Sequence, residues 1–87
     1  MSWSTENLIE LYNWLCRLYT FNFDKKDFAR WARNYLGEDV SIDYTLKIFI
    51  DNELIEEPYR NKLRMKKCGE LDDNDIEIQI IATVLSP

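Results

Sequence analysis

Apolar positions in the first part of the chain recur with helical spacing. Ser4 suits a helix N-cap and predicts a helix that begins near Thr5, with Trp3 and Leu8 forming a hydrophobic staple across its start. The buried face of this helix carries Leu8, Leu11, Tyr12, Leu15, Leu18 and Tyr19. Residues 20–23 then alternate apolar and polar side chains, which favours a brief strand.

Two more helices are predicted from similar signals. Asp24 is placed to cap a helix from Lys25 to Leu36, and Gly37 supplies the left-handed stop that helix ends favour. Its buried side would carry Phe28, Trp31, Ala32 and Tyr35.

Ser41 is placed to cap the third helix. Asn52 is expected to end it in the left-handed conformation, and Pro58 forbids its continuation. The predicted inner face consists of Ile42, Thr45, Leu46, Phe49 and Ile50.

From Tyr59 onward the period changes to two, which is typical of a half-exposed strand. One face would carry Tyr59, Asn61, Leu63 and Met65, and the other Arg60, Lys62, Arg64 and Lys66. Residues 69–74 read as a turn, after which Ile76, Ile78 and Ile80 alternate with Asp75, Glu77 and Gln79, before the apolar run 81–85. This pattern predicts a C-terminal hairpin in which Glu77 and Gln79 approach the bases of the first strand. The alternative fold is a helical bundle without the hairpin.

The order helix, short strand, helix, helix, hairpin resembles a winged-helix domain, and the most similar stretch runs from Val40 to Ile55. The resemblance implies one α+β domain over residues 1–87, with three helices, a short strand and a C-terminal β-hairpin. It also implies that the third helix reads the DNA major groove while the hairpin touches the backbone. The outward positions of that helix would be Ser41, Asp43, Tyr44, Lys47 and Asp51. The two acids there oppose an approach to phosphates, and Lys47 is the only base among these positions.

Composition excludes several classes of site. A chain of 87 residues supports one core, and its large aromatic content, including Trp14 and Trp31, can fill it. With no histidine and no CxxC motif, zinc and other cofactors are not expected. Cys16 and Cys68 lie far apart, so we expect both thiols to be reduced, with Cys16 a packing residue in a cytosolic protein. No apolar run approaches the length needed to span a membrane.

Charge is polarised locally along a chain whose net charge is −5. Residues 60–67 carry five bases and no acid. We call these bases the basic row: Arg60, Lys62, Arg64, Lys66 and Lys67. This row could bind phosphates, together with Tyr44 and Lys47, or it could be a solvated strand face neutralised by nearby acids. The net negative charge itself disfavours non-specific binding to nucleic acid.

The acids that follow the basic row suggest a second candidate surface. The run Asp72, Asp73, Asn74 and Asp75 with Glu77 resembles a calcium loop in composition, but it lacks the glycine and the final glutamate of an EF-hand, so a solvated turn is favoured. A phosphate-like surface that binds a basic protein groove could be formed by Glu53, Glu56, Glu57, Asp72, Asp73 and Asp75.

The sequence gives no indication of catalysis. We find no nucleophile paired with a base, no paired carboxylates and no glycine-rich phosphate loop in it. We therefore expect a non-catalytic binding module. One hypothesis is a small acidic protein that docks onto a protein or nucleoprotein complex and inhibits it, as short phage and mobile-element inhibitors such as anti-CRISPR proteins do. The other is a DNA-binding transcriptional regulator of the winged-helix type. A homodimer through Trp3 or Tyr59 stays open under both hypotheses.

Overall fold

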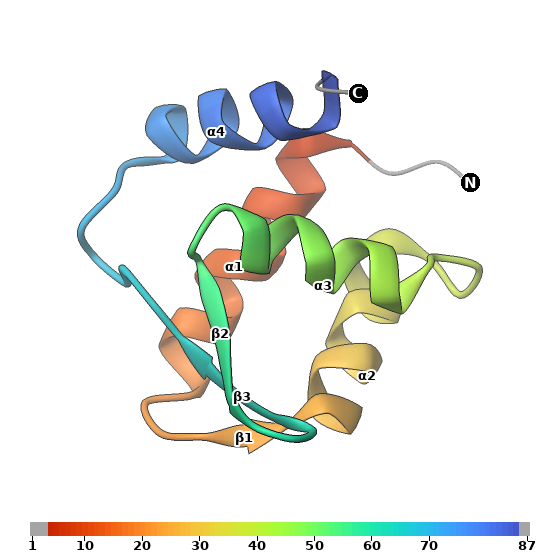
Figure 1. The fold of residues 1–87 in the computed structure, drawn as a ribbon. Coiled ribbons are helices and arrows are strands. Elements are labelled where there is room, and N and C mark those ends of the chain that lie inside the picture. The colour runs from red at the N-terminus through yellow and green to blue at the C-terminus, as the bar shows by residue number, and fades with distance from the viewer. Residues whose placement is uncertain (1–3, 86–87) are drawn as a thin grey trace.

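Four helices and a small three-stranded antiparallel sheet make up the computed structural model, which describes residues 4–85, and the sheet lies at the lower side of the view in Figure 1. The elements are α1 (Thr5–Leu18), β1 (Phe23–Asp24), α2 (Lys25–Leu36), α3 (Ile42–Asp51), β2 (Ile55–Tyr59), β3 (Lys62–Met65) and α4 (Asp73–Leu85). The strands lie in the order β1-β3-β2. The predicted α+β class is confirmed, with one helix more than expected.

The caps of α1 and α3 are those that the sequence predicts. The Ser4 hydroxyl accepts a hydrogen bond from the Asn7 amide, and the Ser41 hydroxyl accepts one from the Tyr44 amide, both at 3.2 Å. Each bond satisfies one amide of the first helical turn, which has no partner within the helix. The staple through Trp3 lies outside the described residues.

Two predictions about helix ends are wrong, one at the start of α2 and one at the end of α3. α2 spans the predicted residues and ends at Gly37 with φ 106°, but the Asp24 side chain caps nothing and instead pairs with Lys62 on the neighbouring strand. At the end of α3, Asn52 has φ −92°, and Glu53 takes the left-handed conformation with φ 59°. The Asn52 amide donates to the Ile48 carbonyl, so this side chain closes the helix by a hydrogen bond rather than by a positive φ.

The hairpin exists, but it starts earlier in the chain than predicted. β2 and β3 pair around the turn at Arg60 and Asn61, where Asn61 has φ 63°, a conformation that asparagine tolerates well. Pro58 lies within the edge strand β2 at the register shift between Glu56 and Tyr59, a place where a residue without an N–H is tolerated. The period-two pattern is correct for β3, where Leu63 is buried and its neighbours are exposed. The bundle alternative is therefore wrong.

The segment predicted as the second hairpin strand is helix α4. Ile76 and Ile80 are fully buried, whereas Ile78, which a strand would place on the same face, is 59 % exposed. Positions four apart share one face of a helix, and the position between them lies on the opposite side. α4 packs on α1 and α3, so Glu77 and Gln79 do not face the basic row as predicted (Figure 1).

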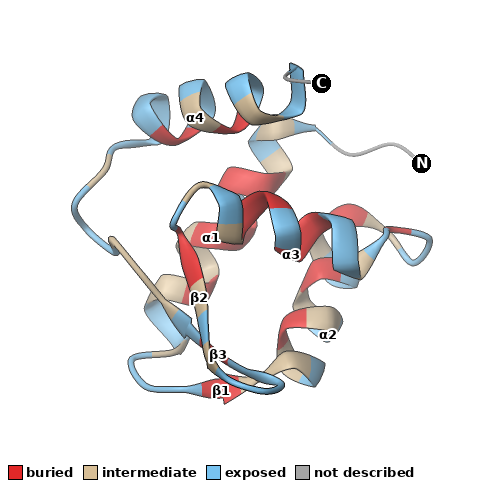
Figure 2. Ribbon diagram, in the orientation of Figure 1, coloured by how far each residue is buried: buried red, intermediate tan, exposed pale blue. Residues whose placement is uncertain are grey.

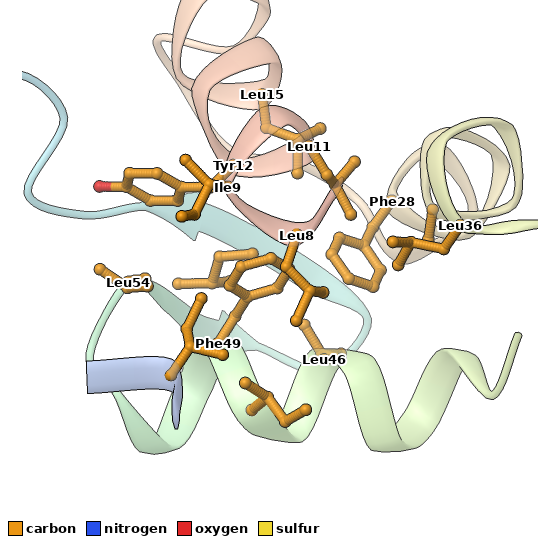
Figure 3. Packing of buried hydrophobic residues seen from close by; sticks show 14 of the residues in the cluster. Leu8, Ile9, Leu11, Tyr12, Leu15, Phe28, Leu36, Leu46, Phe49 and Leu54 are labelled. Atoms are coloured by element: carbon orange, nitrogen blue, oxygen red, sulfur yellow. The ribbon is translucent and has the colours of Figure 1, made fainter. Parts of the chain in front are cut away.

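Buried side chains from all four helices and the sheet form one cluster, and the helix faces turned toward the centre are the buried ones (Figure 2). Leu8 and Leu11 of α1 meet Phe28 of α2 and Phe49 of α3 at its middle (Figure 3). Phe28 and Phe49 pack edge to face with ring centroids 6.0 Å apart. Among the predicted inner residues, Leu18 is exposed, which corrects the prediction for α1. Others are only half-buried: Tyr19, Trp31, Tyr35, Ile42 and Ile50. Ile48 and Leu36, which were not predicted, are buried.

A disulfide joins Cys16 on α1 to Cys68, with the Cα atoms 5.6 Å apart. The prediction of two reduced thiols is therefore wrong in this structure. The cysteines are 52 positions apart in sequence, but the chain leaving β3 turns back along α1 on its way to α4 (Figure 1). Their proximity is a product of the tertiary fold, which residue spacing did not reveal.

Candidate functional site

Three of the five bases in the basic row pair with acids of the sheet or of the turn before β2. Lys62 pairs with Asp24 on β1, Arg64 pairs with Glu56 on β2, and Lys67 lies 3.6 Å from Glu53. Hydrogen bonding to Lys62 lowers the pKa of the Asp24 carboxyl. These bases are therefore held by partners inside the chain and are less available to a phosphate.

The other two members of the row are placed differently. Arg60 lies in the β2–β3 turn, and Lys66 follows β3 with its backbone carbonyl accepting a hydrogen bond from the Tyr12 hydroxyl at 2.5 Å. Neither makes an ion pair among residues 4–85. Two of the five bases in the basic row, Arg60 and Lys66, thus remain available to contact a negatively charged partner.

The outward face of α3 is also internally balanced. Lys47 pairs with Asp51 at 2.7 Å, which raises the pKa of the lysine, and Asp43 lies 3.3 Å from Lys25 of α2. Tyr44 is exposed beside them. With its one lysine already paired, this helix offers no net positive charge to a DNA groove.

The six acids predicted as one surface fall into two separate groups. Glu53 and Glu56 pair with bases near the sheet, and Glu57 accepts a hydrogen bond from the Asn61 amide at 2.8 Å. The remaining three, Asp72, Asp73 and Asp75, lie at the start of α4. Because α4 is a helix packed on α1, Asp73 meets Asn13 of α1, while Asp72 and Asp75 are exposed at the helix start.

The start of α4 and α1 together form a groove of about 340 Å³, which we call the acidic groove. Its lining residues are Glu6, Ile9, Glu10, Asn13, Asp73 and Glu77. The Asn13 amide donates to the Asp73 carboxylate at 3.0 Å, which ties the two helices together. The Asp72 carboxylate accepts a hydrogen bond from the Asp75 amide at 2.8 Å, so Asp72 begins a helix rather than a solvated turn.

Sequence reasoning missed Glu6 and Glu10 as site residues. They lie four positions apart on one side of α1, as Asp73 and Glu77 do on α4. The first spacing is visible in the sequence, but the second places two acids on one side only if residues 76–80 form a helix and not the predicted strand. Only the packing of α4 on α1 brings the two pairs to one groove.

The acids without an ion pair are concentrated around this groove. Six of the sixteen acids are ion-paired within the described chain. Seven of the other ten lie on α1, on α4 or just before α4: Glu6, Glu10, Glu70, Asp72, Asp73, Asp75 and Glu77. Among the five unpaired bases, only Arg17 lies on either helix. The excess of acid that gives the chain its net charge of −5 therefore lies on α1, on α4 and in the turn before α4.

The chain matches no protein-family model, no curated protein and no solved structure. Its function therefore has to be inferred from the residues themselves.

An exposed apolar surface continues from the acidic groove along α4. We call it the apolar stripe; it consists of Ile78, Ile81, Val84 and Leu85, of which Leu85 is 77 % exposed. Ile81 lies one turn beyond Glu77 on the same side of the helix. Residues 78–85 contain no charged side chain, so α4 has an acidic first half and an apolar second half. Figure 2 shows the outer side of this helix exposed along its length.

Other kinds of site find no support in residues 4–85. The described cysteines and acids bring together no group of three or more that could hold a metal ion. No helix in the same range has the length and apolar character to cross a membrane. Trp14 and Trp31 are both half-buried and pack edge to face at 5.2 Å, and Tyr59 is exposed on β2.

Proposed function

We propose that this protein is a non-catalytic binding module that docks through α4 onto a basic surface of a protein or nucleoprotein complex and blocks that surface. The observation that carries the proposal is the gathering of unpaired acids around the acidic groove, next to the apolar stripe. Surface charges elsewhere are mostly matched within the chain.

The two parts of α4 have different physical roles in this proposal. The acidic groove attracts a positively charged partner over long range, which speeds association and orients the two molecules. The apolar stripe then supplies burial, because apolar surface removed from water is the main source of affinity in most protein associations. The matching partner has an apolar patch next to a cluster of lysines and arginines.

Partners of this chemistry include protein surfaces that otherwise hold the phosphates of a nucleic acid. Such a surface is rich in bases, and a protein with a concentrated acidic end can occupy it in place of the nucleic acid. This agrees with the inhibitor hypothesis from size and acidity. The cytosolic location expected from the sequence stays a prediction.

The alternative is a DNA-binding regulator. It is favoured by the element order, with a β1-β3-β2 sheet and a hairpin after the third helix, which agrees with the resemblance to winged helices. Arg60 at the hairpin turn is its best candidate for a phosphate contact. The internally paired charges of α3 and of Lys62 and Arg64 weigh against it.

The proposal is tested by titrating ¹⁵N-labelled protein with an amphipathic helical peptide of leucine and lysine, as a probe for a basic partner. We expect shifts at the acidic groove and the apolar stripe, at least tenfold weaker binding by a Glu10→Lys/Glu77→Lys variant, and near-native binding by Glu38→Lys/Asp39→Lys. The control carries the same charge change in the exposed loop between α2 and α3. Equal weakening in both variants would mean that net charge alone drives binding, and the proposal would fail.

The alternative is tested with labelled duplex DNA at low and at physiological salt. Binding that weakens with salt and disappears in an Arg60→Glu/Lys66→Glu variant, but survives Glu10→Lys/Glu77→Lys, would establish the regulator hypothesis. The absence of binding at low salt would exclude duplex DNA as a direct partner.

A further inference from the structure

A second concavity, of about 510 Å³, opens between one side of α2, the start of α3 and the β2–β3 turn. We call it the basic pocket. Its walls include Lys25, Lys26, Ala29, Arg33, Ile42 and Asn61. It lies on other elements than the acidic groove, which is built from α1 and α4.

The pocket gathers four basic or acidic groups of which two bases make no ion pair within residues 4–85, although Lys26 also acts on the Asp24 carboxyl beside it. Lys26 and Arg33 belong to the five bases that make no ion pair within residues 4–85. The one acid in the lining, Asp24, is already held by Lys62, and Lys25 is paired with Asp43. A protein with net charge −5 thus has two unmatched cations in one hollow.

The walls of the pocket are held together by backbone bonds. The Lys25 amide donates to the Asn61 carbonyl at 3.0 Å, which fixes the hairpin turn against the start of α2. The Asn61 amide in turn donates to the Glu57 carboxylate at 2.8 Å. A site whose walls are connected before binding loses less conformational entropy when a ligand enters.

The polar and apolar walls suggest a ligand of mixed character. Arg33 presents a planar fork of donors that suits phosphate, and Lys26 adds a point charge. Ala29 and Ile42 provide an apolar wall beside these bases, and the volume falls in the range of small-molecule sites.

We propose that the basic pocket binds a small organic phosphate. Lys26 and Arg33 hold the phosphate, and Ala29 and Ile42 contact the apolar part of the molecule. A duplex is disfavoured because α3, whose start borders the pocket, carries two acids, Asp43 and Asp51, against one base, Lys47. The site is independent of the docking surface on α4.

The test is a titration of ¹⁵N-labelled protein with adenosine monophosphate, inorganic phosphate and adenosine. We expect shifts of the Ala29, Ile42 and Asn61 amides, with the monophosphate binding more tightly than either fragment. A Lys26→Gln/Arg33→Gln variant should bind at least tenfold more weakly. Arg17→Gln, which removes an unpaired base from α1, should leave the affinity unchanged.

Three results would overturn the proposal. The first is the absence of shifts in the pocket at millimolar monophosphate. The second is equal binding by adenosine or by the double variant, since the phosphate would then not be recognised there. The third is a duplex DNA that shifts the same amides at physiological salt with higher affinity than the monophosphate, which would assign these bases to a nucleic-acid backbone. A failure of α4 docking alters none of these outcomes.

Discussion

The Tyr12 hydroxyl, on α1, donates a hydrogen bond to the backbone carbonyl of Lys66, 54 positions later in the chain, at 2.5 Å. Tyr12 is only 2 % exposed, and its ring stacks near Phe49 with centroids 6.3 Å apart. This one side chain thus joins the helical core to the chain that leaves the sheet. The disulfide between Cys16 and Cys68 fastens the same two segments one helical turn further along.

Replacing Tyr12 by Phe should lower the free energy of unfolding by about 1–2 kcal/mol, since it removes this hydrogen bond and leaves a part-buried carbonyl without its partner. Urea denaturation at neutral pH measures the loss. A variant as stable as the native protein would show that water replaces the hydroxyl at no cost.

The same residue predicts a response to alkaline pH. Burial, with a contribution from Glu70, raises the pKa of Tyr12 from 10.0 to about 12. Because the folded protein holds this proton more tightly than the unfolded chain, its contribution to stability is complete below pH 10.0 and is lost as the pH rises toward about 12. The free energy of unfolding should therefore fall more steeply above pH 10 in the native protein than in Tyr12→Phe. Parallel curves would contradict the raised pKa.

Reduction of the Cys16–Cys68 disulfide should destabilise the fold. A link across 52 positions restricts the unfolded chain, and the chain-entropy model assigns it roughly 4 kcal/mol. Denaturation with and without a reducing agent measures the difference, and a Cys16→Ser/Cys68→Ser variant should match the reduced protein. Two titratable thiols in unreduced, unfolded protein would show that the bond does not form.

The helical state of α4 can be tested with a matched pair of variants. Ile76→Ala should cost about 2–5 kcal/mol because the side chain is fully buried, while Ile78→Ala should change stability by less than about 0.5 kcal/mol. The two residues would lie on the same face of a strand. Equal losses in the two variants would therefore favour the strand.

The pair between Asp24 and Lys62 makes a prediction at acidic pH. Since Lys62 lowers the pKa of the Asp24 carboxyl from 3.8, stability from the pair is present above pH 3.8 and is lost as the pH falls through the lowered value. In Lys62→Gln the carboxyl, followed by NMR, should titrate closer to 3.8. An unchanged pKa would place the cause elsewhere.

Local sequence signals predicted the first three helices because the residues that begin and end a helix lie next to it in sequence. Ser4 and Ser41 cap the helices that follow them, and Gly37 ends α2. The period of two predicted from Tyr59 onward identified β3 for a similar reason, since one exposed face and one buried face leave a direct mark on the sequence. It extended too far toward the N-terminus, because Tyr59 ends β2 and Asn61 lies in the turn.

Residues 73–85 were misassigned because α4 is apolar on two sides. Ile76 and Ile80 face the core and Ile78 faces outward, so the three together imitate the alternation of a strand. The same error affected the prediction of the site residues. Asp73 and Glu77 meet Glu6 and Glu10 only if 73–85 is a helix on α1, and the pairing of Lys62 and Arg64 with Asp24 and Glu56 depends on strand register.

The amino-acid sequence by itself determined the α+β class, the Ser4 and Ser41 caps, the presence of one hairpin strand and the excess of acid. These follow from spacing and composition over a few neighbouring residues. Only the tertiary structure decided the pairing of Cys16 with Cys68, which bases are neutralised, and where the unpaired acids gather. Each of these depends on the distance between residues remote in sequence, and packing sets that distance.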